Sequence, residues 1–196
     1  MTSPMLNEPT LYLDFDGVLH PADVRVTQAE PRRPRVYNGG PTDHPLLEHV
    51  HLLERILAPF GDVKIILSTS WVRVLGYEYT VQMLPLALRE RVVGTIWRGE
   101  LLQHPPRTRY DAIQTDADKR GRVRWLALDD DLDGWPCEEF CRVIAPSNSW
   151  YGLGQPGKAE ELAEALALLC DGRPLQSRLP QVPHCPSTVE RLFGPN

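Results

Sequence analysis

Two aspartates one residue apart, Asp14 and Asp16, follow a short apolar run, and Gly17 comes directly after them. Side chains alternate along an extended segment, so both carboxylates lie on the same side of the backbone as the run ends. Two negative charges this close are unfavourable unless a cation or a shared proton relieves them, and Mg²⁺, which prefers oxygen ligands, is the simplest relief. Because glycine lets the chain turn sharply here, the pattern predicts a metal-assisted carboxylate site at the end of a strand.

The same Asp-x-Asp-Gly pattern also occurs in simple turns and in Ca²⁺-binding loops. A Ca²⁺ loop needs further oxygen ligands at alternating positions and a closing glutamate. The residues that follow, Val18 to Pro21, cannot supply these ligands, so the sequence excludes a Ca²⁺ loop. A simple turn stays open as the structural alternative to a metal site.

A second apolar run ends in hydroxyl side chains, Ser68, Thr69 and Ser70, and Trp71 follows them. Hydroxyls next to a turn at the carboxyl end of a strand are well placed to donate hydrogen bonds to a phosphoryl oxygen, together with nearby backbone N–H groups. The same residue types also form Ser/Thr turns and helix caps. Taken alone, this segment fits a phosphate site and a structural turn equally well.

A third apolar run, Leu126–Leu128, ends in Asp129, Asp130 and Asp131. Adjacent acids also occur in solvated loops. Here, however, two strand ends carry carboxylates, and a hydroxyl-rich strand end lies between them in the sequence. This arrangement favours one shared site over an unrelated surface loop.

Short apolar segments alternate along the chain with segments of helical periodicity. In the apolar segments polar residues mostly do not alternate with apolar ones, which is typical of strands covered on both faces, as in parallel sheets. The predicted strands are Thr10–Asp14, Val63–Ser68, Val92–Trp97, Trp125–Asp129 and Arg142–Ala145. The predicted helices are His44–Ala58, with Asp43 as its N-cap, Tyr79–Arg91, Arg109–Lys119 and Lys158–Cys170.

Alternating strands and helices predict the α/β class, with a Rossmann-like, doubly wound, three-layer α/β/α sandwich and a mainly parallel central sheet. In such sheets ligands bind beyond the carboxyl ends of the strands, where the sequence places the acids. At 196 residues the chain is long enough for one well-buried domain and short for two. We expect an N-terminal extension over 1–9, a main domain over 10–172 with a flap or loop over 21–43, and a proline-rich tail over 173–196.

Composition and charge restrict the class of protein. A net charge of −5 argues against a protein that coats nucleic acid through bulk electrostatics. Arginines nevertheless gather at 32–35 and at 107–124, where they form a solvated surface or hold an anionic substrate. No apolar run approaches bilayer length and no secretory signal is visible, so we expect a cytoplasmic protein without a membrane partner. The four cysteines are too sparse for a disulfide framework and are expected to be reduced.

The three strand ends resemble the motifs of the haloacid dehalogenase-like (HAD) hydrolase superfamily. The segment Asp14-Phe15-Asp16-Gly17-Val18 matches the first motif of that family, Ser68-Thr69-Ser70 matches the second, and Asp129-Asp130 matches its paired acids. Order and spacing agree over roughly residues 10–170. The resemblance assigns the main domain, 10–172, to the HAD-like hydrolases as a small capless member of the phosphatase type.

Within that family, the resemblance implies that Asp14 is the nucleophile and forms an aspartyl-phosphate. Asp16 protonates the departing oxygen and then deprotonates the water that hydrolyses the intermediate. The cofactor is Mg²⁺, held by the Asp14 carboxylate, the Asp16 backbone carbonyl and an acid of the last motif. For that acid we expect Asp130, with Asp129 in support.

The resemblance also implies two kinds of phosphate-binding residue. Thr69 is the expected hydroxyl, because Trp71 follows it as in related small members, and Ser68 is the alternative. The family places a cation at the start of the helix before the last acidic strand, where it offsets the charge of the nucleophile and the phosphoryl group. Arg109 has about the right separation and precedes an apolar helical pattern, whereas Lys119 is more often the right residue type but lies nearer the strand. We expect Arg109, with Lys119 as the alternative.

The aspartate at position 16 bears on the reaction. Members that break carbon–halogen bonds lack an acid there, because halide leaves without a proton, and transport ATPases of the family carry threonine. The resemblance therefore implies an enzyme, a Mg²⁺-dependent phosphatase that hydrolyses a phosphomonoester. A phosphomutase and a catalytically weak binding or regulatory module with the same fold are the alternatives.

Larger relatives insert a cap domain after the first motif or before the last acidic strand, and here both gaps are too short for more than a flap. An open site admits a bulky phosphorylated substrate, such as a nucleic-acid end or a phosphoprotein, or is closed by a partner subunit in a homo-oligomer. A nucleotide or another small phosphomonoester is also compatible. The Thr69-Ser70-Trp71 turn and Gly152-Leu153 resemble small capless bacterial domains, some of them associated with RNA repair.

Overall fold

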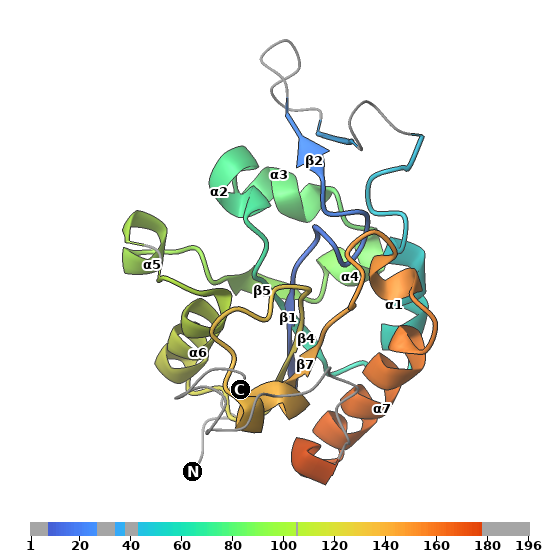
Figure 1. Ribbon diagram of the computed structural model, residues 1–196. Coiled ribbons are helices and arrows are strands. Elements are labelled where there is room, and N and C mark those ends of the chain that lie inside the picture. The colour runs from blue at the N-terminus through green and yellow to red at the C-terminus, as the bar shows by residue number, and fades with distance from the viewer. Residues whose placement is uncertain (1–7, 27–33, 38–42, 105, 178–196) are drawn as a thin grey trace, which may run out of the picture.

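A five-stranded parallel sheet forms the centre of the fold (Figure 1). The computed structural model describes residues 8–26, 34–37, 43–104 and 106–177. The strand order is β5, β4, β1, β6, β7, and the bounds are β1 Thr10–Leu13, β4 Lys64–Leu67, β5 Val92–Thr95, β6 Trp125–Leu128 and β7 Val143–Ile144. Each predicted strand is therefore present and is only slightly shorter than expected.

The register of the sheet aligns the ends of its three central strands. Leu13, the last residue of β1, pairs with Leu67 of β4 on one side and with Leu128 of β6 on the other. Because the strands are parallel, the next residue of each emerges at the same edge of the sheet. The residues that follow these strands are Asp14, Ser68 and Asp129.

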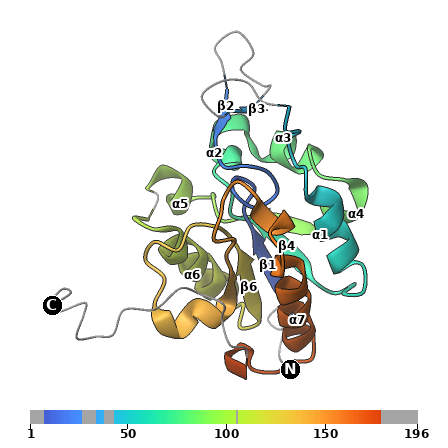
Figure 2. The ribbon, with the colours of Figure 1, turned by 45° about the vertical axis from the view of Figure 1, so that its right-hand side comes forward.

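The central strands are covered on both faces, which explains their unalternated apolar sequences. All residues of β1 and β6 are buried. Helices α1 (Val50–Leu57) and α7 (Lys158–Cys170) pack together on one side of the sheet, and α6 (Arg109–Arg120) lies on the other (Figures 1 and 2). This arrangement confirms the predicted Rossmann-like three-layer sandwich.

Shorter elements complete the described structure. Helices α2 (Trp71–Leu75) and α3 (Tyr77–Gln82) lie beyond the carboxyl ends of the strands (Figures 1 and 2). The others are α4 (Leu86–Arg89), α5 (Glu100–Gln103) and 3₁₀ helices at Cys137–Arg142, Gly152–Gly154 and Leu175–Ser177.

Two predicted helices differ from the observed ones. The helix expected over His44–Ala58 begins only at Val50, because Leu47 has a positive φ of 57°, which a helix does not allow. The N–H of His49 donates to the carbonyl of Leu19 (2.9 Å), so this segment is tied to the loop after β1. His49 directly precedes α1, and the prediction of Asp43 as N-cap is wrong.

The helix expected over Tyr79–Arg91 is divided into α3 and α4. Pro85 lies between them and precedes the first residue of α4. Proline lacks the N–H that a continuing helix needs, and its ring collides with the preceding turn. The predicted helices Arg109–Lys119 and Lys158–Cys170 are confirmed as α6 and α7, with α6 one residue longer.

The predicted flap contains an antiparallel strand pair, β2 (Val24–Arg25) and β3 (Arg35–Val36). Figure 2 shows this pair next to α2, at the end of the molecule to which the central strands point. Residues 27–33 and 38–42 of the flap lie outside the described residues, as do 1–7 of the predicted extension and 178–196 of the predicted tail.

The structure bears on two expectations drawn from composition, those on membrane spans and on cysteines. Within the described ranges, no helix combines the length and apolarity needed to cross a bilayer. Cys141 and Cys170 are reduced thiols, whereas Cys137 forms a disulfide, contrary to the expectation of reduced cysteines.

A glycine contact joins the loop after β7 to the loop after β1. The N–H of Leu153 donates to the carbonyl oxygen of Val18 (2.7 Å), and a Cβ atom at Gly152 would lie 2.3 Å from that same oxygen. Gly152 also has a φ of +49°, which favours glycine. The last loop therefore packs directly on the backbone that follows Asp14 and Asp16.

We expect Gly152→Ala to lower the free energy of unfolding more than Gly157→Ala. Gly157 also has a positive φ (+84°), but a Cβ atom there would meet nothing within 4 Å. Both variants lose about 1 kcal/mol to the left-handed conformation, and only Gly152→Ala adds about 1–3 kcal/mol of overpacking against backbone. Urea unfolding of the two variants measures the difference, and equal losses would contradict the tight contact with Val18.

Candidate active site

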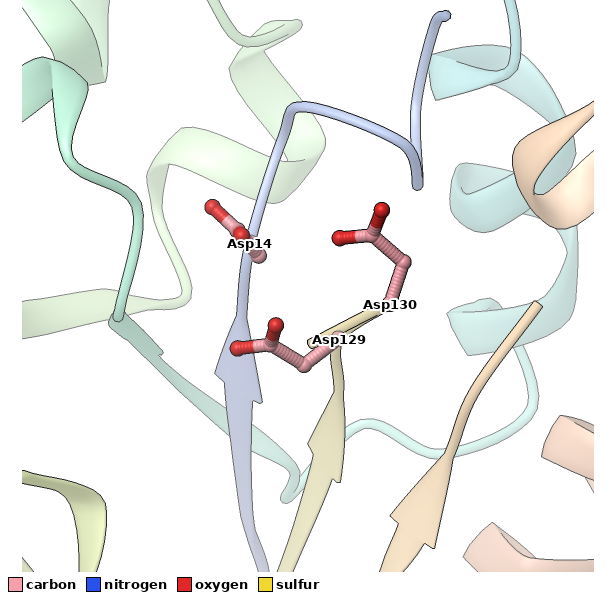
Figure 3. A group of neighbouring side chains, drawn as sticks. All are labelled: Asp14, Asp129 and Asp130. Atoms are coloured by element: carbon pink, nitrogen blue, oxygen red, sulfur yellow. The ribbon is translucent and has the colours of Figure 1, made fainter. Parts of the chain in front are cut away.

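Three carboxylates from two adjacent strand ends converge at the edge of the sheet (Figure 3). Asp14 follows β1, and Asp129 and Asp130 follow β6. One oxygen of each lies within 4.8 Å of an oxygen of the other two. Asp14 and Asp129 are buried and Asp130 is half-buried. The structure thus brings together the acids of the first and last predicted strand ends.

The glycine of the Asp-x-Asp-Gly segment makes room for one of these acids. Gly17 has a φ of +68°, and a Cβ atom there would lie 2.0 Å from Oδ2 of Asp130. Any side chain at this position would therefore collide with the carboxyl group. Besides permitting a turn, the glycine lets Asp130 pack against the loop that carries Asp14 and Asp16.

Burial makes the ionised forms of these acids costly. It raises the pKa of Asp129 well above its ordinary value, and the charge of Asp14 raises it further. Burial, followed by the charge of Asp14, raises the pKa of Asp130 to about 6. The pKa of Asp14 is also raised, because burial outweighs the opposing effect of Arg109. Three acids so close together and so little solvated require positive charge beside them.

Arg109, the first residue of α6, supplies part of that charge. Its Nη2 lies 3.3 Å from Oδ2 of Asp14, and its Nη1 lies 3.8 Å from Oδ2 of Asp129. The same guanidinium donates a hydrogen bond to the backbone carbonyl of Ser68. Burial opposes its charged form, but Asp14 and Asp129 outweigh that effect and raise the pKa of Arg109. Arg109 therefore joins all three central strand ends.

Lys119, the alternative cation, lies elsewhere. Its Nζ is 3.6 Å from Oε2 of Glu100, and its side chain is half-exposed. The start of α6 is fixed by Thr108, whose hydroxyl accepts a hydrogen bond from the N–H of Asp111 (3.2 Å). This cap begins the helix at Arg109, and the structure brings that residue, and not Lys119, to the acids.

Both candidate hydroxyls, Ser68 and Thr69, are fully buried at the end of β4. The Thr69 hydroxyl accepts the N–H of Trp71 (3.3 Å), and its hydrogen bond to Asp14 offsets a small part of the rise in the pKa of that acid caused by burial. The Ser68 hydroxyl has no hydrogen-bond partner among the described residues. The indole N–H of Trp97 donates to the carbonyls of Ser68 (3.0 Å) and Thr69 (2.7 Å) and so fixes the turn. Ser68 thus has an uncommitted donor, whereas Thr69 orients the Asp14 carboxylate.

Asp16 lies apart from the three converging carboxylates. Both of its carboxylate oxygens accept the indole N–H of Trp71 (2.9 Å each), and Oδ1 also contacts Nε2 of His20 (3.1 Å). His20 is fully buried, and its Nδ1 accepts the N–H of Leu47 (3.4 Å), so the ring proton lies on Nε2 and is donated to Asp16. The Asp16 side chain is 28% exposed, so solvent reaches a carboxylate that two donors hold in place.

Neither His20 nor Trp71 is identified as a site residue from the sequence. His20 lies in the same loop as Asp16, whereas Trp71 reaches Asp16 from the end of β4, and the ring of Trp71 also packs edge-on against Phe15 (5.7 Å between centroids). A single histidine after a strand and a tryptophan after a hydroxyl run are common in ordinary loops. The structure is needed to show that both side chains form hydrogen bonds with Asp16.

The converging acids fit a divalent cation. Oδ2 of Asp129 is buried, and no residue in the described part of the chain forms a hydrogen bond with it, although Arg109 lies nearby. Three ionised carboxylates beside one guanidinium leave a net negative charge, and carboxylate oxygens are the donors that Mg²⁺ prefers. Asp16 adds no carboxylate to this group, because its side chain is held by Trp71 and His20.

Comparison with known proteins adds one finding. A family model described as the HAD domain in Swiss Army Knife RNA repair proteins matches residues 10–156. The matched range is well over half of the chain and includes all three central strand ends and Arg109. No curated protein and no solved structure matches the chain.

We expect Mg²⁺ to raise the Tm at pH 7.5 and to raise it less at pH 5. Because the pKa of Asp130 rises to about 6 in the folded protein, the folded state binds more protons than the unfolded state between about pH 4 and pH 6. Ionisation of Asp130 therefore lowers the free energy of unfolding as the pH rises through this range. A divalent cation relieves that cost at pH 7.5, whereas protons compete with the cation at pH 5. Thermal unfolding with Mg²⁺ or with a chelator measures both shifts.

Two neighbouring substitutions make the metal test specific. Asp130→Asn removes a converging carboxylate and is expected to abolish most of the Mg²⁺ shift at pH 7.5. Asp131→Asn changes an exposed acid outside the converging group and is expected to keep the shift. Shifts of equal size in the two variants would contradict a metal site at the three acids.

Proposed function

The chain belongs to the family of HAD domains in Swiss Army Knife RNA repair proteins, and on that premise we propose that it is a Mg²⁺-dependent phosphatase. It hydrolyses a phosphomonoester through an aspartyl-phosphate on Asp14, and its substrate is a nucleotide or a nucleic-acid end. The observation that carries the proposal is the buried Asp14 carboxylate, 3.3 Å from Arg109 and gathered with Asp129 and Asp130.

Asp14 is held in place as a nucleophile. Its Oδ1 accepts the N–H of Phe15 (2.8 Å), and its Oδ2 faces Arg109. In the first step one Asp14 oxygen forms a bond to phosphorus, while the bond from phosphorus to the leaving oxygen breaks. Arg109 offsets the charges of the carboxylate and the phosphoryl group, which would otherwise repel each other.

Asp16 handles the protons in both steps. Trp71 and His20 fix its carboxylate by hydrogen bonds, and its partial exposure lets it exchange protons with solvent. It gives a proton to the leaving oxygen in the first step. In the second step it takes a proton from a water molecule, whose oxygen attacks phosphorus, so that phosphate leaves and the Asp14 carboxylate is regenerated.

The remaining residues would hold the metal ion and bind the phosphoryl group. Asp14, Asp129 and Asp130 are the residues that would hold Mg²⁺, which when bound supplies positive charge beside the phosphoryl oxygens. The uncommitted hydroxyl of Ser68 and the hydroxyl of Thr69 lie at the adjacent strand end and are the donors to those oxygens.

The alternatives find less support. A phosphomutase needs an enclosed site that retains its intermediate, and the gaps on either side of the hydroxyl strand end leave room only for a flap. A binding or regulatory module does not require the complete group of three acids, a buried cation and an anchored Asp16. The family description favours nucleic-acid ends as the substrate class.

We expect Asp14→Asn to lower kcat/KM for p-nitrophenyl phosphate with Mg²⁺ by about three orders of magnitude or more. The change is nearly isosteric, so far-UV circular dichroism and the Tm are expected to stay close to those of the parent protein. If the folded variant had the same turnover as the parent protein, the assignment of Asp14 as the nucleophile would be wrong. A parent protein without any turnover would favour the regulatory module.

For Asp16→Asn we expect a loss that depends on the leaving group. An alkyl alcohol leaves poorly without a proton, so kcat/KM for an alkyl phosphate is expected to fall by about 10²–10⁴-fold. p-Nitrophenolate leaves readily as an anion, so its ester is expected to lose much less in the first step. Steady-state kinetics with both esters checks the contrast, and equal losses would contradict proton donation by Asp16.

A further inference from the structure

A pocket of about 260 Å³ opens beside Asp16. One wall comes from the flap, with Val24 and Val26, and the other comes from α2, with Val74 and Leu75. Asp16 itself belongs to the lining. The pocket therefore begins at the Asp16 carboxylate and continues between the flap and α2.

The lining of the pocket is mostly aliphatic. Among the described residues that form it, Asp16 is the only charged one and Ser70 the only neutral polar side chain apart from the indole of Trp71. Trp71 already donates its N–H to Asp16. Val26 and Val74 are 39% and 68% exposed, although valine is among the residues most often buried. These walls suit an uncharged body with an apolar face and offer few hydrogen bonds to a sugar-like one.

The position of Asp16 determines which part of the substrate lies in the pocket. The phosphoryl group lies at Asp14, and the leaving oxygen must lie within reach of Asp16. The group attached to that oxygen therefore extends from Asp16 into the pocket. This step rests on the proposed function, because it takes Asp16 as the proton donor.

We propose that this pocket binds the base of the nucleoside that carries the phosphate, with little preference among the bases. The volume lies just below the usual range for ligand sites, about 300–1,000 Å³, so the pocket holds one ring system and not a run of nucleotides. A lining poor in hydrogen-bonding groups contacts the apolar faces of a flat ring. It does not distinguish one base from another by the polar groups at their edges.

The surroundings of the pocket suit a nucleic-acid end. Arg25 on β2 and Arg73 on α2 are exposed cations on the two elements that form the walls. Arg25 pairs with Asp23 (3.0 Å) and Arg73 lies over the ring of Trp97 (5.1 Å to its centroid), and both guanidinium groups remain on the surface, where they would meet phosphates of the neighbouring nucleotides. A phosphotyrosyl peptide also carries a ring next to its phosphate, and its binding serves as the competing outcome of the test below.

The experiment measures binding and turnover separately. Isothermal titration calorimetry with the Asp14→Asn protein and Mg²⁺ compares nucleoside 3′- and 5′-monophosphates with the ribose phosphates that lack the base. We expect the base to lower Kd at least about tenfold, as burial of roughly 50–60 Å² of apolar surface would. The four common bases are expected to agree within about threefold, since each tenfold difference would need about 1.4 kcal/mol.

Two wall substitutions and a matched control test the place of binding. Val74→Asp, made in the Asp14→Asn protein, is expected to remove most of the gain from the base and to leave the Kd of ribose phosphate nearly unchanged. Leu86→Asp, on α4, changes a helical residue of similar exposure (64%) outside the pocket and is expected to keep the gain. Val26→Asp, on the flap, repeats the test from the opposite wall if Val74→Asp lowers the Tm.

Three results would overturn the inference. They are no gain from the base, an equal loss of the gain in Val74→Asp and Leu86→Asp, and tighter binding of a phosphotyrosyl peptide than of any nucleotide. Base-dependent binding together with a parent protein that turns over no phosphomonoester would keep the pocket and reject the phosphatase. Turnover of ribose phosphate and nucleotides with equal kcat/KM and Kd would keep the phosphatase and reject the pocket.

Discussion

The repulsion between buried carboxylates is the interaction on which the rest of the structure depends. Asp14 and Asp129 are almost fully buried, Asp130 lies against them, and one guanidinium stands beside the group. In a poorly solvated place such charges repel strongly. The sheet can impose this proximity because its central strands are buried and hydrogen-bonded on both sides. The sheet thereby keeps an arrangement of carboxylates that a flexible loop would relax, and these carboxylates could hold a metal ion.

The elements above the sheet add a second, separate task. Trp71 begins α2, holds Asp16 through its indole N–H, and also lines the pocket beside the flap. One side chain thus connects Asp16, the proposed proton donor, to the surface proposed to meet the leaving group. His20 completes the arrangement from the other direction, because its second ring nitrogen accepts the N–H of Leu47. The positive φ of the same Leu47 delays the start of α1, so the residue that keeps this segment out of the helix also contacts the histidine that holds Asp16.

The sequence predicts those parts of the fold that depend on local pattern. Buried parallel strands show unbroken apolar runs, and the acids and hydroxyls that end them are visible without coordinates, so the sheet and the convergence of Asp14 with Asp129 and Asp130 follow from the sequence. The choice between Arg109 and Lys119 depends on where α6 begins, which Thr108 fixes by a cap. The contact of Trp71 with Asp16 and that of His20 with Leu47 join segments far apart in the chain, and no local sequence pattern indicates them. Leu47 keeps the helical spacing of apolar residues but not the helical backbone, and pattern alone does not show this difference.

The contact between Gly152 and Val18 has a consequence for how small this domain can be. Every side chain proposed to act on phosphorus lies before residue 131, so the chemistry alone would allow a much shorter polypeptide. Yet the loop that follows β7 packs on the backbone at Val18, just after Asp14 and Asp16. No space for even a methyl group is left between Gly152 and Val18. A shortened version or a split gene product that stopped before this loop would retain all the reactive groups and lack the support beneath them. The boundary of the functional unit is therefore set by backbone packing and not by the last catalytic residue.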